Sequence, residues 1–183
     1  MIMDLTQLVE KCRTGDRLAV ERLVQEFQPM MYRLAISILD DTREAEEATQ
    51  DAMFAALQAL NSYRGEAAFT TWLYAITLNL CRNRLRAQHR RSRVYALFHG
   101  LRRLKEEKAI EPEERVIQRE NSSLIYRTIQ SLDEKHRLPV ILRYYHDCSI
   151  DEIAQILDIP PGTVHSRLNK ARRILKHRLS ASH

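Results

Sequence analysis

The chain has 183 residues, of which 44% are hydrophobic, and this fraction is typical of a folded protein rather than a disordered one. It holds only four glycines and five prolines while Ala, Leu, Glu and Arg are abundant, so the composition predicts an all-α fold. The formal net charge of +5 is mild, and neither a signal peptide nor an apolar run of roughly 18 residues is present, so we expect a cytoplasmic protein without membrane insertion.

The first 39 residues predict helices. Apolar residues recur at helical spacing from Leu5 to Phe27, and Gly15 with Asp16 interrupts them where a turn and the N-cap of a second helix would fall. Pro29 indicates either a kink or the start of a new helix. Residues 30–39 carry apolar side chains on most sides, so we expect them to form a buried helix.

The next predicted helix is acidic. Asp41 and Glu44 have the spacing of a capping box, and regularly placed alanines continue the helix into Asn61. Six carboxylates lie within twelve positions, opposed only by Arg43: Asp40, Asp41, Glu44, Glu46, Glu47 and Asp51. This concentration of one charge indicates a basic partner.

A long helix is predicted from Phe69 to about Arg93, after a polar loop over residues 62–68. Beside its apolar stripe, one narrow edge carries an aromatic ring, two amides and two guanidinium groups: Trp72, Asn79, Asn83, Arg86 and Arg90. Such an edge can hold phosphates and stack on an unpaired base, which is how proteins bind single-stranded nucleic acid. For Trp72 itself, a place in the hydrophobic core is an equally good interpretation.

The helical pattern weakens beyond this point, which indicates a linker. We therefore expect one domain at residues 1–93 and a second at 113–183, joined by a linker over 94–112. In the second domain the apolar spacing predicts helices around 116–132 and 134–145, followed by two more.

The last two helices have the spacing of a helix-turn-helix. Ser149 and Glu152 form a capping box before a short helix, a turn follows, and Pro161 suits the first turn of another helix. The outer face of that last helix has no carboxylate: it carries Ser166, Asn169, Lys170, Arg173 and His177. A recognition helix in the major groove needs this division between an apolar and a polar, basic face. The simpler interpretation is a solvated basic face on an ordinary helix.

No motif for catalysis or for a cofactor is present. The sequence has neither a Gly-rich phosphate loop nor a nucleophile motif, so we predict that the protein is not an enzyme and holds no cofactor. His146, Asp147 and Cys148 are adjacent, but successive side chains diverge, so we predict no metal site. Cys12, Cys81 and Cys148 are widely spaced in apolar patterns and indicate inert, partly buried thiols.

Two strings in the sequence resemble conserved regions of the extracytoplasmic-function sigma factors, the sigma-E-like group of the sigma-70 family. NSYRGEAAFTTWLYAITLN (61–79) is similar to their second region, and IPPGTVHSRLNKAR (159–172) to their fourth. The resemblance covers nearly the whole chain. It implies two small helical domains, sigma region 2 and sigma region 4, the second containing the helix-turn-helix. The implied function is to bind core RNA polymerase, recognise the −35 and −10 promoter elements and help to open the DNA.

The resemblance also implies roles for particular residues. The acidic helix would bind the clamp helices of the polymerase β′ subunit through Glu46, Glu47, Gln50 and Asp51. The −10 element, as duplex and then as single strand, would contact Asn61, Tyr63, Arg64, Trp72, Asn79, Asn83, Arg86 and Arg90. Within this set the loop up to Ala68 would capture a flipped base with Trp72 and Asn79, while Arg82 to Arg91 would hold the adjoining DNA. The −35 element would be read by Thr163, His165, Ser166, Arg167, Asn169, Lys170 and Arg173. The other implied partners are the polymerase β flap and an anti-sigma factor.

A stand-alone helix-turn-helix transcriptional regulator is the alternative, because the last 70 residues would look similar in one. The acidic helix and the single-strand edge in the first half favour a sigma factor, since a repressor needs neither. The linker departs from the family in being basic, with six cations from Arg91 to Lys108, whereas such linkers are often acidic. We therefore assign the linker no function.

Overall fold

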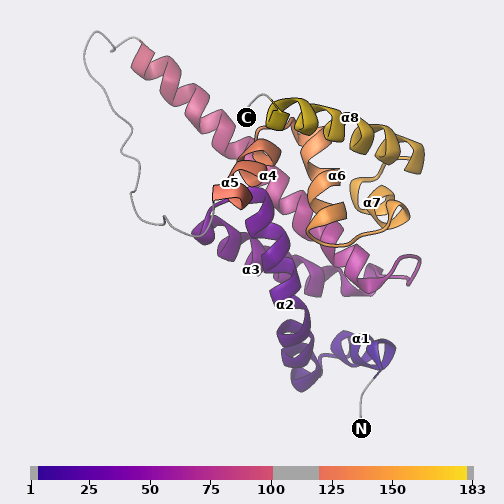
Figure 1. Cartoon of the computed structure of the whole chain (residues 1–183). Coiled ribbons are helices and arrows are strands. Elements are labelled where there is room, and N and C mark those ends of the chain that lie inside the picture. The colour runs from indigo at the N-terminus through magenta and orange to yellow at the C-terminus, as the bar shows by residue number, and fades with distance from the viewer. Residues whose placement is uncertain (1–3, 101–119, 181–183) are drawn as a thin grey trace.

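The computed structural model describes residues 4–100 and 120–180, and all regular structure within them is helical (Figure 1). This confirms the all-α fold class. The helices are α1 (Leu5–Arg13), α2 (Arg17–Leu39), α3 (Thr42–Ala59), a 3-10 turn (Leu60–Ser62), α4 (Phe69–Gly100), α5 (Glu120–Gln130), α6 (Glu134–Tyr144), α7 (Ile150–Leu157) and α8 (Pro161–Ser180).

Short polar residues set the starts of the first helices, as the sequence predicts. The Asp16 carboxylate accepts hydrogen bonds from the backbone N–H groups of Leu18 and Ala19, and Gly15 takes the positive φ of +83° that the preceding turn requires. Helix α2 then continues through Pro29 to Leu39, so this proline does not begin a new helix. The Asp41 carboxylate caps α3 by accepting from the backbone N–H of Glu44.

Helices α2, α3 and α4 pack together as a bundle, with α1 against α2. Helix α3 contributes mainly alanines to this core, among them the fully buried Ala48 and Ala52. Small side chains let the helix backbones approach closely, while larger residues such as Leu23, Phe27 and Leu73 fill the remaining space. The exposed side of α3 is therefore free to carry charge.

The second half contains the predicted helix-turn-helix in α7 and α8. Ser149 and Glu152 form both hydrogen bonds of the capping box that begins α7, which confirms that prediction. Asp158, in the left-handed region at φ 52°, ends α7, and Pro161 begins α8. Val164, Leu168 and Ala171 bury one side of α8, so the opposite side faces solvent.

Helix α4 extends to Gly100, past the end near Arg93 that the sequence predicts and into the proposed linker. The rest of that linker, together with residues 113–119 of the second predicted domain, lies outside the described residues. Helix α5 is therefore followed only from Glu120. The domain limits at 93 and 113 stay a prediction.

The two halves of the chain share one hydrophobic core. Leu34, Ile38 and Leu78 from the first half lie in the same cluster of buried residues as Ile141 and Ile153 from the second. Helix α7 packs against α4, and α6 packs against α2 (Figure 1). Because each half buries apolar surface against the other, their contact stabilises this closed arrangement.

Candidate partner and nucleic-acid interfaces

An arginine from α4 binds three carboxylates on the acidic side of α3. The Arg84 guanidinium donates hydrogen bonds to Glu44 at 2.9 Å, Glu47 at 3.1 Å and Asp51 at 2.6 Å. Burial lowers the pKa of Arg84, but the three carboxylates raise it by more, so its net pKa is above the ordinary value. Arg84 thus fixes two of the four predicted docking residues.

The other two predicted docking residues, Glu46 and Gln50, are exposed on the same helix. We call Glu46, Glu47, Gln50 and Asp51 together with the exposed ring of Phe54 the docking face of α3. The Phe54 side chain is 63% exposed, and the sequence analysis did not single it out. Its position one turn beyond Gln50 and Asp51 is the signal that could have found it.

The loop after α3 is held by aromatic packing. The Tyr63 ring lies 5.1 Å from Phe69 and 5.3 Å from Trp72, measured between ring centroids, and its hydroxyl donates to the carbonyl of Ala67 at 2.9 Å. The Arg13 guanidinium donates to the carbonyls of Leu60 and Tyr63. These contacts give the loop a defined shape before any ligand binds, and Asn61 and Arg64 are exposed on it.

The predicted single-strand edge on α4 is exposed along most of its length. Asn79, Asn83, Arg86 and Arg90 all face solvent on one side of the helix. Trp72 at the start of the edge is half-buried against Phe69 and Tyr63. The structure thus places the loop directly before α4 and the amide and guanidinium groups along α4. Trp72 supports the loop through its contact with Tyr63.

The predicted recognition residues on α8 differ in how far their side chains are exposed. His165, Ser166, Asn169, Lys170 and Arg173 are exposed, whereas Thr163 and Arg167 are half-buried. The neighbouring Arg172 donates to the Tyr144 hydroxyl at 2.9 Å and to Asn169 at 3.1 Å, and its guanidinium lies 5.9 Å from the centre of the Tyr144 ring. Most of this helix therefore presents a basic, hydrogen-bonding surface.

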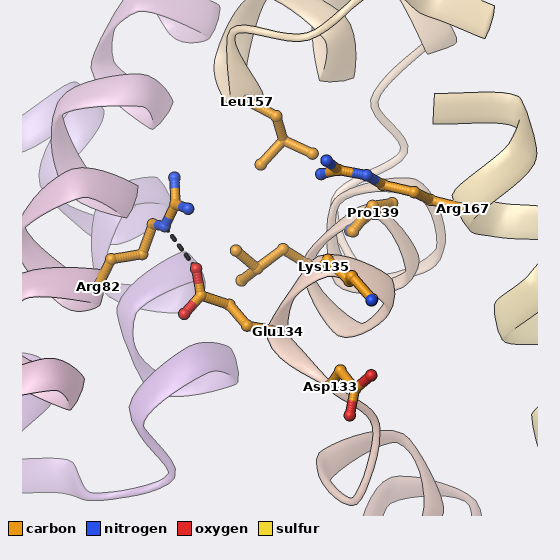
Figure 2. A pocket seen from close by; sticks show the side chains of 8 residues that line it. Arg82, Asp133, Glu134, Lys135, Pro139, Leu157 and Arg167 are labelled. Carbon is orange, nitrogen blue, oxygen red and sulfur yellow. Dashed lines mark hydrogen bonds and ion pairs between the residues drawn. The ribbon is translucent and has the colours of Figure 1, made fainter. Parts of the chain in front are cut away.

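A groove of about 430 Å³ lies where α4 meets α6 and α8 (Figure 2). Arg82 of α4 reaches across to Glu134 of α6 and donates to its carboxylate at 2.6 Å. Arg167 of α8 and Lys135 of α6 line the same groove. Two arginines that the resemblance assigns to promoter DNA, Arg82 and Arg167, thus lie at the contact between the halves of the chain.

His146 of the second half contacts two hydroxyl groups of the first half. Its Nε2 lies 3.2 Å from the Ser37 hydroxyl and its Nδ1 3.3 Å from the Tyr74 hydroxyl. Because Ser37 donates to the carbonyl of Leu34 at 2.8 Å, it accepts from His146, and Tyr74 donates to the other ring nitrogen. Burial, and then the nearby charge of Arg33, lower the pKa of His146, which favours this neutral ring.

Two further hydrogen bonds join the halves. The Tyr126 hydroxyl donates to the Asp40 carboxylate at 2.9 Å, and the Gln130 amide donates to the carbonyl of Ser37 at 3.1 Å. We call the contacts of His146, Tyr126 and Gln130 with the first half, together with the pair of Arg82 and Glu134, the domain contact.

The three cysteines are free, as the sequence predicts, and they are buried more fully than the sequence predicts. Within residues 4–100 and 120–180, no group of three His, Cys, Asp or Glu side chains could hold a metal ion. Among the helices of the same ranges, none is both long and apolar enough to cross a membrane.

Comparison with known proteins shows the family of the chain. The family described as Sigma-70 region 2 matches residues 23–91, and the family described as Sigma-70, region 4 matches residues 122–175. The chain is 37% identical to the ECF RNA polymerase sigma-E factor of Escherichia coli. The match covers 94% of this chain and 92% of that protein. The chain belongs to the extracytoplasmic-function sigma factors. It directs promoter-specific initiation of transcription, and the stand-alone regulator is not favoured.

Other relatives agree. The RNA polymerase sigma-H factor of Pseudomonas aeruginosa is 36% identical over 92% of this sigma factor and 90% of its own length. CnrH, solved in complex with the cytosolic domain of CnrY, has a TM-score of 0.67 at 22% identity, covering 96% of this chain and 97% of that one. The sigma factor RpoE of Bartonella quintana, solved with the anti-sigma factor NepR, has a TM-score of 0.62 at 23% identity, covering 89% and 98%. The two solved structures share the fold.

Proposed function

We propose that this sigma factor binds core RNA polymerase through the docking face of α3 and promoter DNA through α4 and α8. The observation that carries the proposal is the presence, in one chain of this family, of an acidic face on α3 and a carboxylate-free basic face on α8. Opposite charges on two separate helices suit two different partners, one basic and one a polyanion.

For the polymerase, Glu46, Glu47, Gln50 and Asp51 bind the clamp helices of the β′ subunit, and region 4 contacts the β flap. The ion pairs of Arg84 support the first assignment, because they hold Glu47 and Asp51 in place before the partner arrives. A partner that meets ordered carboxylates loses less side-chain entropy on binding.

For the −10 element, the loop with Asn61, Tyr63 and Arg64 captures an unpaired base as the duplex opens. The exposed Asn79 and Asn83 hydrogen-bond the displaced strand, and Arg86 and Arg90 neutralise its phosphates. Trp72 contributes through Tyr63, on whose ring it packs.

For the −35 element, α8 enters the major groove with Ser166, Asn169 and Lys170 toward the bases and Arg173 toward phosphate. Thr163 and His165 lie at the start of the helix, where recognition helices contact DNA. Arg167 joins them once it leaves the groove that it shares with Arg82.

The remaining assignments follow from the family. The chain serves as a non-catalytic subunit without a cofactor and works in the cytoplasm, where the polymerase is. An anti-sigma factor controls it, a proposal supported by the sigma factor RpoE of Bartonella quintana, which has the same fold and was solved with the anti-sigma factor NepR.

Reconstituted transcription tests the proposal. Core polymerase with this protein should start transcripts at defined sites, and start-site sequencing after overexpression should give two shared elements upstream of them. Core polymerase with a variant lacking the helix-turn-helix of α7 and α8 is the matched control and should lose starts at these promoters. Starts that share no upstream sequence would refute the proposal.

A further inference from the structure

Phe54 is exposed where its helix has no structural need for an aromatic ring. The described phenylalanines Phe27 and Phe69 are at most 7% exposed, whereas Phe54 is 63% exposed. On the opposite side of α3, small residues such as Ala52 and Ala56 make the core contacts. An exposed phenyl ring does not contribute the folding stability that burial would give. A partner that covers the ring removes it from water and so stabilises the complex.

The neighbours of Phe54 are the proposed docking residues. Gln50 and Asp51 lie one helical turn before it and Glu47 two turns before it, so all of them share its face. Arg84 draws Glu47 and Asp51 toward α4, which leaves Phe54 uncovered between them and the exposed Gln50. An aromatic ring ringed by polar groups is the pattern of an energetic hot spot in protein interfaces.

We propose that Phe54 is the apolar anchor of the polymerase-docking face. The partner surface is basic, to match the carboxylates around the ring, and offers an apolar recess between its cations. This inference rests on the proposed function and deepens it, because it names a contact that charge alone does not supply. The interaction consequently keeps part of its strength at high salt.

Phe54→Ala tests the anchor, and Leu18→Ala is the matched control because Leu18 is also apolar and highly exposed, at 76%, but lies on α2. Affinity for core polymerase should fall by about 30-fold in Phe54→Ala and stay within about twofold in Leu18→Ala. Thermal unfolding should be unchanged in both, since neither side chain is packed. Wild-type affinity of Phe54→Ala would refute the anchor.

Two further measurements separate the possible failures. Core binding by Glu47→Lys with Asp51→Lys reports on the docking face as a whole. Normal core binding by this double variant would refute the proposed function. If the double variant loses core binding while Phe54→Ala binds normally, only the anchor is refuted. Sedimentation of the free protein reports on the other possible occupant. If Phe54→Ala dissociates a dimer without changing core affinity, the ring is covered by a second copy and the inference is wrong.

Discussion

Helices α3 and α8 are both amphipathic, but their exposed faces carry opposite charges. Each buries small and aliphatic residues on one side and displays charge on the other, but α3 displays carboxylates and α8 displays cations. On α3 the charges are held by Arg84, whereas Lys170, Arg173 and Lys176 of α8 extend into solvent. The difference indicates two kinds of recognition: ordered carboxylates suit a folded protein partner, and exposed cations suit the phosphates of DNA.

The largest expected effect is on the α3 side of this comparison. Glu47→Lys with Asp51→Lys should weaken core binding by more than about 100-fold, because two attractive contacts become repulsive. The new lysines also face Arg84, so we expect a stability loss of about 1 to 2 kcal/mol. Pull-down and urea unfolding measure the two effects separately. Normal core binding with reduced stability would make the Arg84 cluster purely structural.

The next effect concerns strand opening on α4. Asn79→Ala removes an exposed amide from the proposed single-strand edge and should cost about 1.5 kcal/mol in open-complex formation, as for the loss of one hydrogen bond. Permanganate reactivity of the −10 region measures opening. A template with a pre-melted bubble should restore transcription at least in part, since opening is already supplied. Wild-type opening on duplex templates would place the base-binding surface elsewhere.

Within α8, the comparison predicts a division between base reading and phosphate binding. Arg167→Ala should relax sequence preference at the −35 element by about 1 kcal/mol, at the low end for a base contact because Arg167 is half-buried. Lys176→Ala should weaken binding to all sequences and reduce the salt dependence. Binding titrations on a set of −35 variants at two salt concentrations distinguish the two. Identical sequence profiles would contradict the division.

The smallest effect tests how α7, which supports α8, is held. Backbone and side-chain hydrogen bonds with Ser149 lower the pKa of Glu152 below its ordinary value of 4.5. A lowered carboxyl pKa stabilises the fold above pH 4.5, and the stabilisation is lost as the pH falls further. Glu152→Gln should therefore lose about 0.5 to 1 kcal/mol at pH 7, measured by urea unfolding. Its difference from the wild type should shrink below pH 4.5, and a constant difference would exclude this cause.

Local signals explain why most of the fold could be predicted from the sequence. Asp16, Asp41 and Ser149 mark helix starts through bonds to residues two or three positions away, and those bonds are present. Pro29 was ambiguous, because a proline stops a helix only where its neighbours cannot absorb the missing hydrogen bond. Exposed positions on single helices, such as Asn79 and Lys170, also follow from helical periodicity.

Contacts between distant segments could not be predicted in this way. Arg84 meets Asp51 across 33 positions, Arg82 meets Glu134 across 52, and His146 meets Ser37 across 109. No periodicity within a helix specifies such partners, since they depend on how the helices pack. The half-buried place of Trp72 has the same origin, because Phe69 and Tyr63 enclose it only after the loop folds back.

The buried cysteines make thiol modification a measure of how often the hydrophobic cores of this sigma factor open. Burial raises the pKa of Cys81 to about 12 and that of Cys148 to about 11, so neither thiol ionises appreciably at neutral pH. Both lie in the core that the two halves share, whereas Cys12 belongs to the core of the first half alone. A thiol reagent can reach Cys81 and Cys148 only when the shared core opens, so their rate of modification relative to that of Cys12 compares openings of the shared core with openings of the core of the first half.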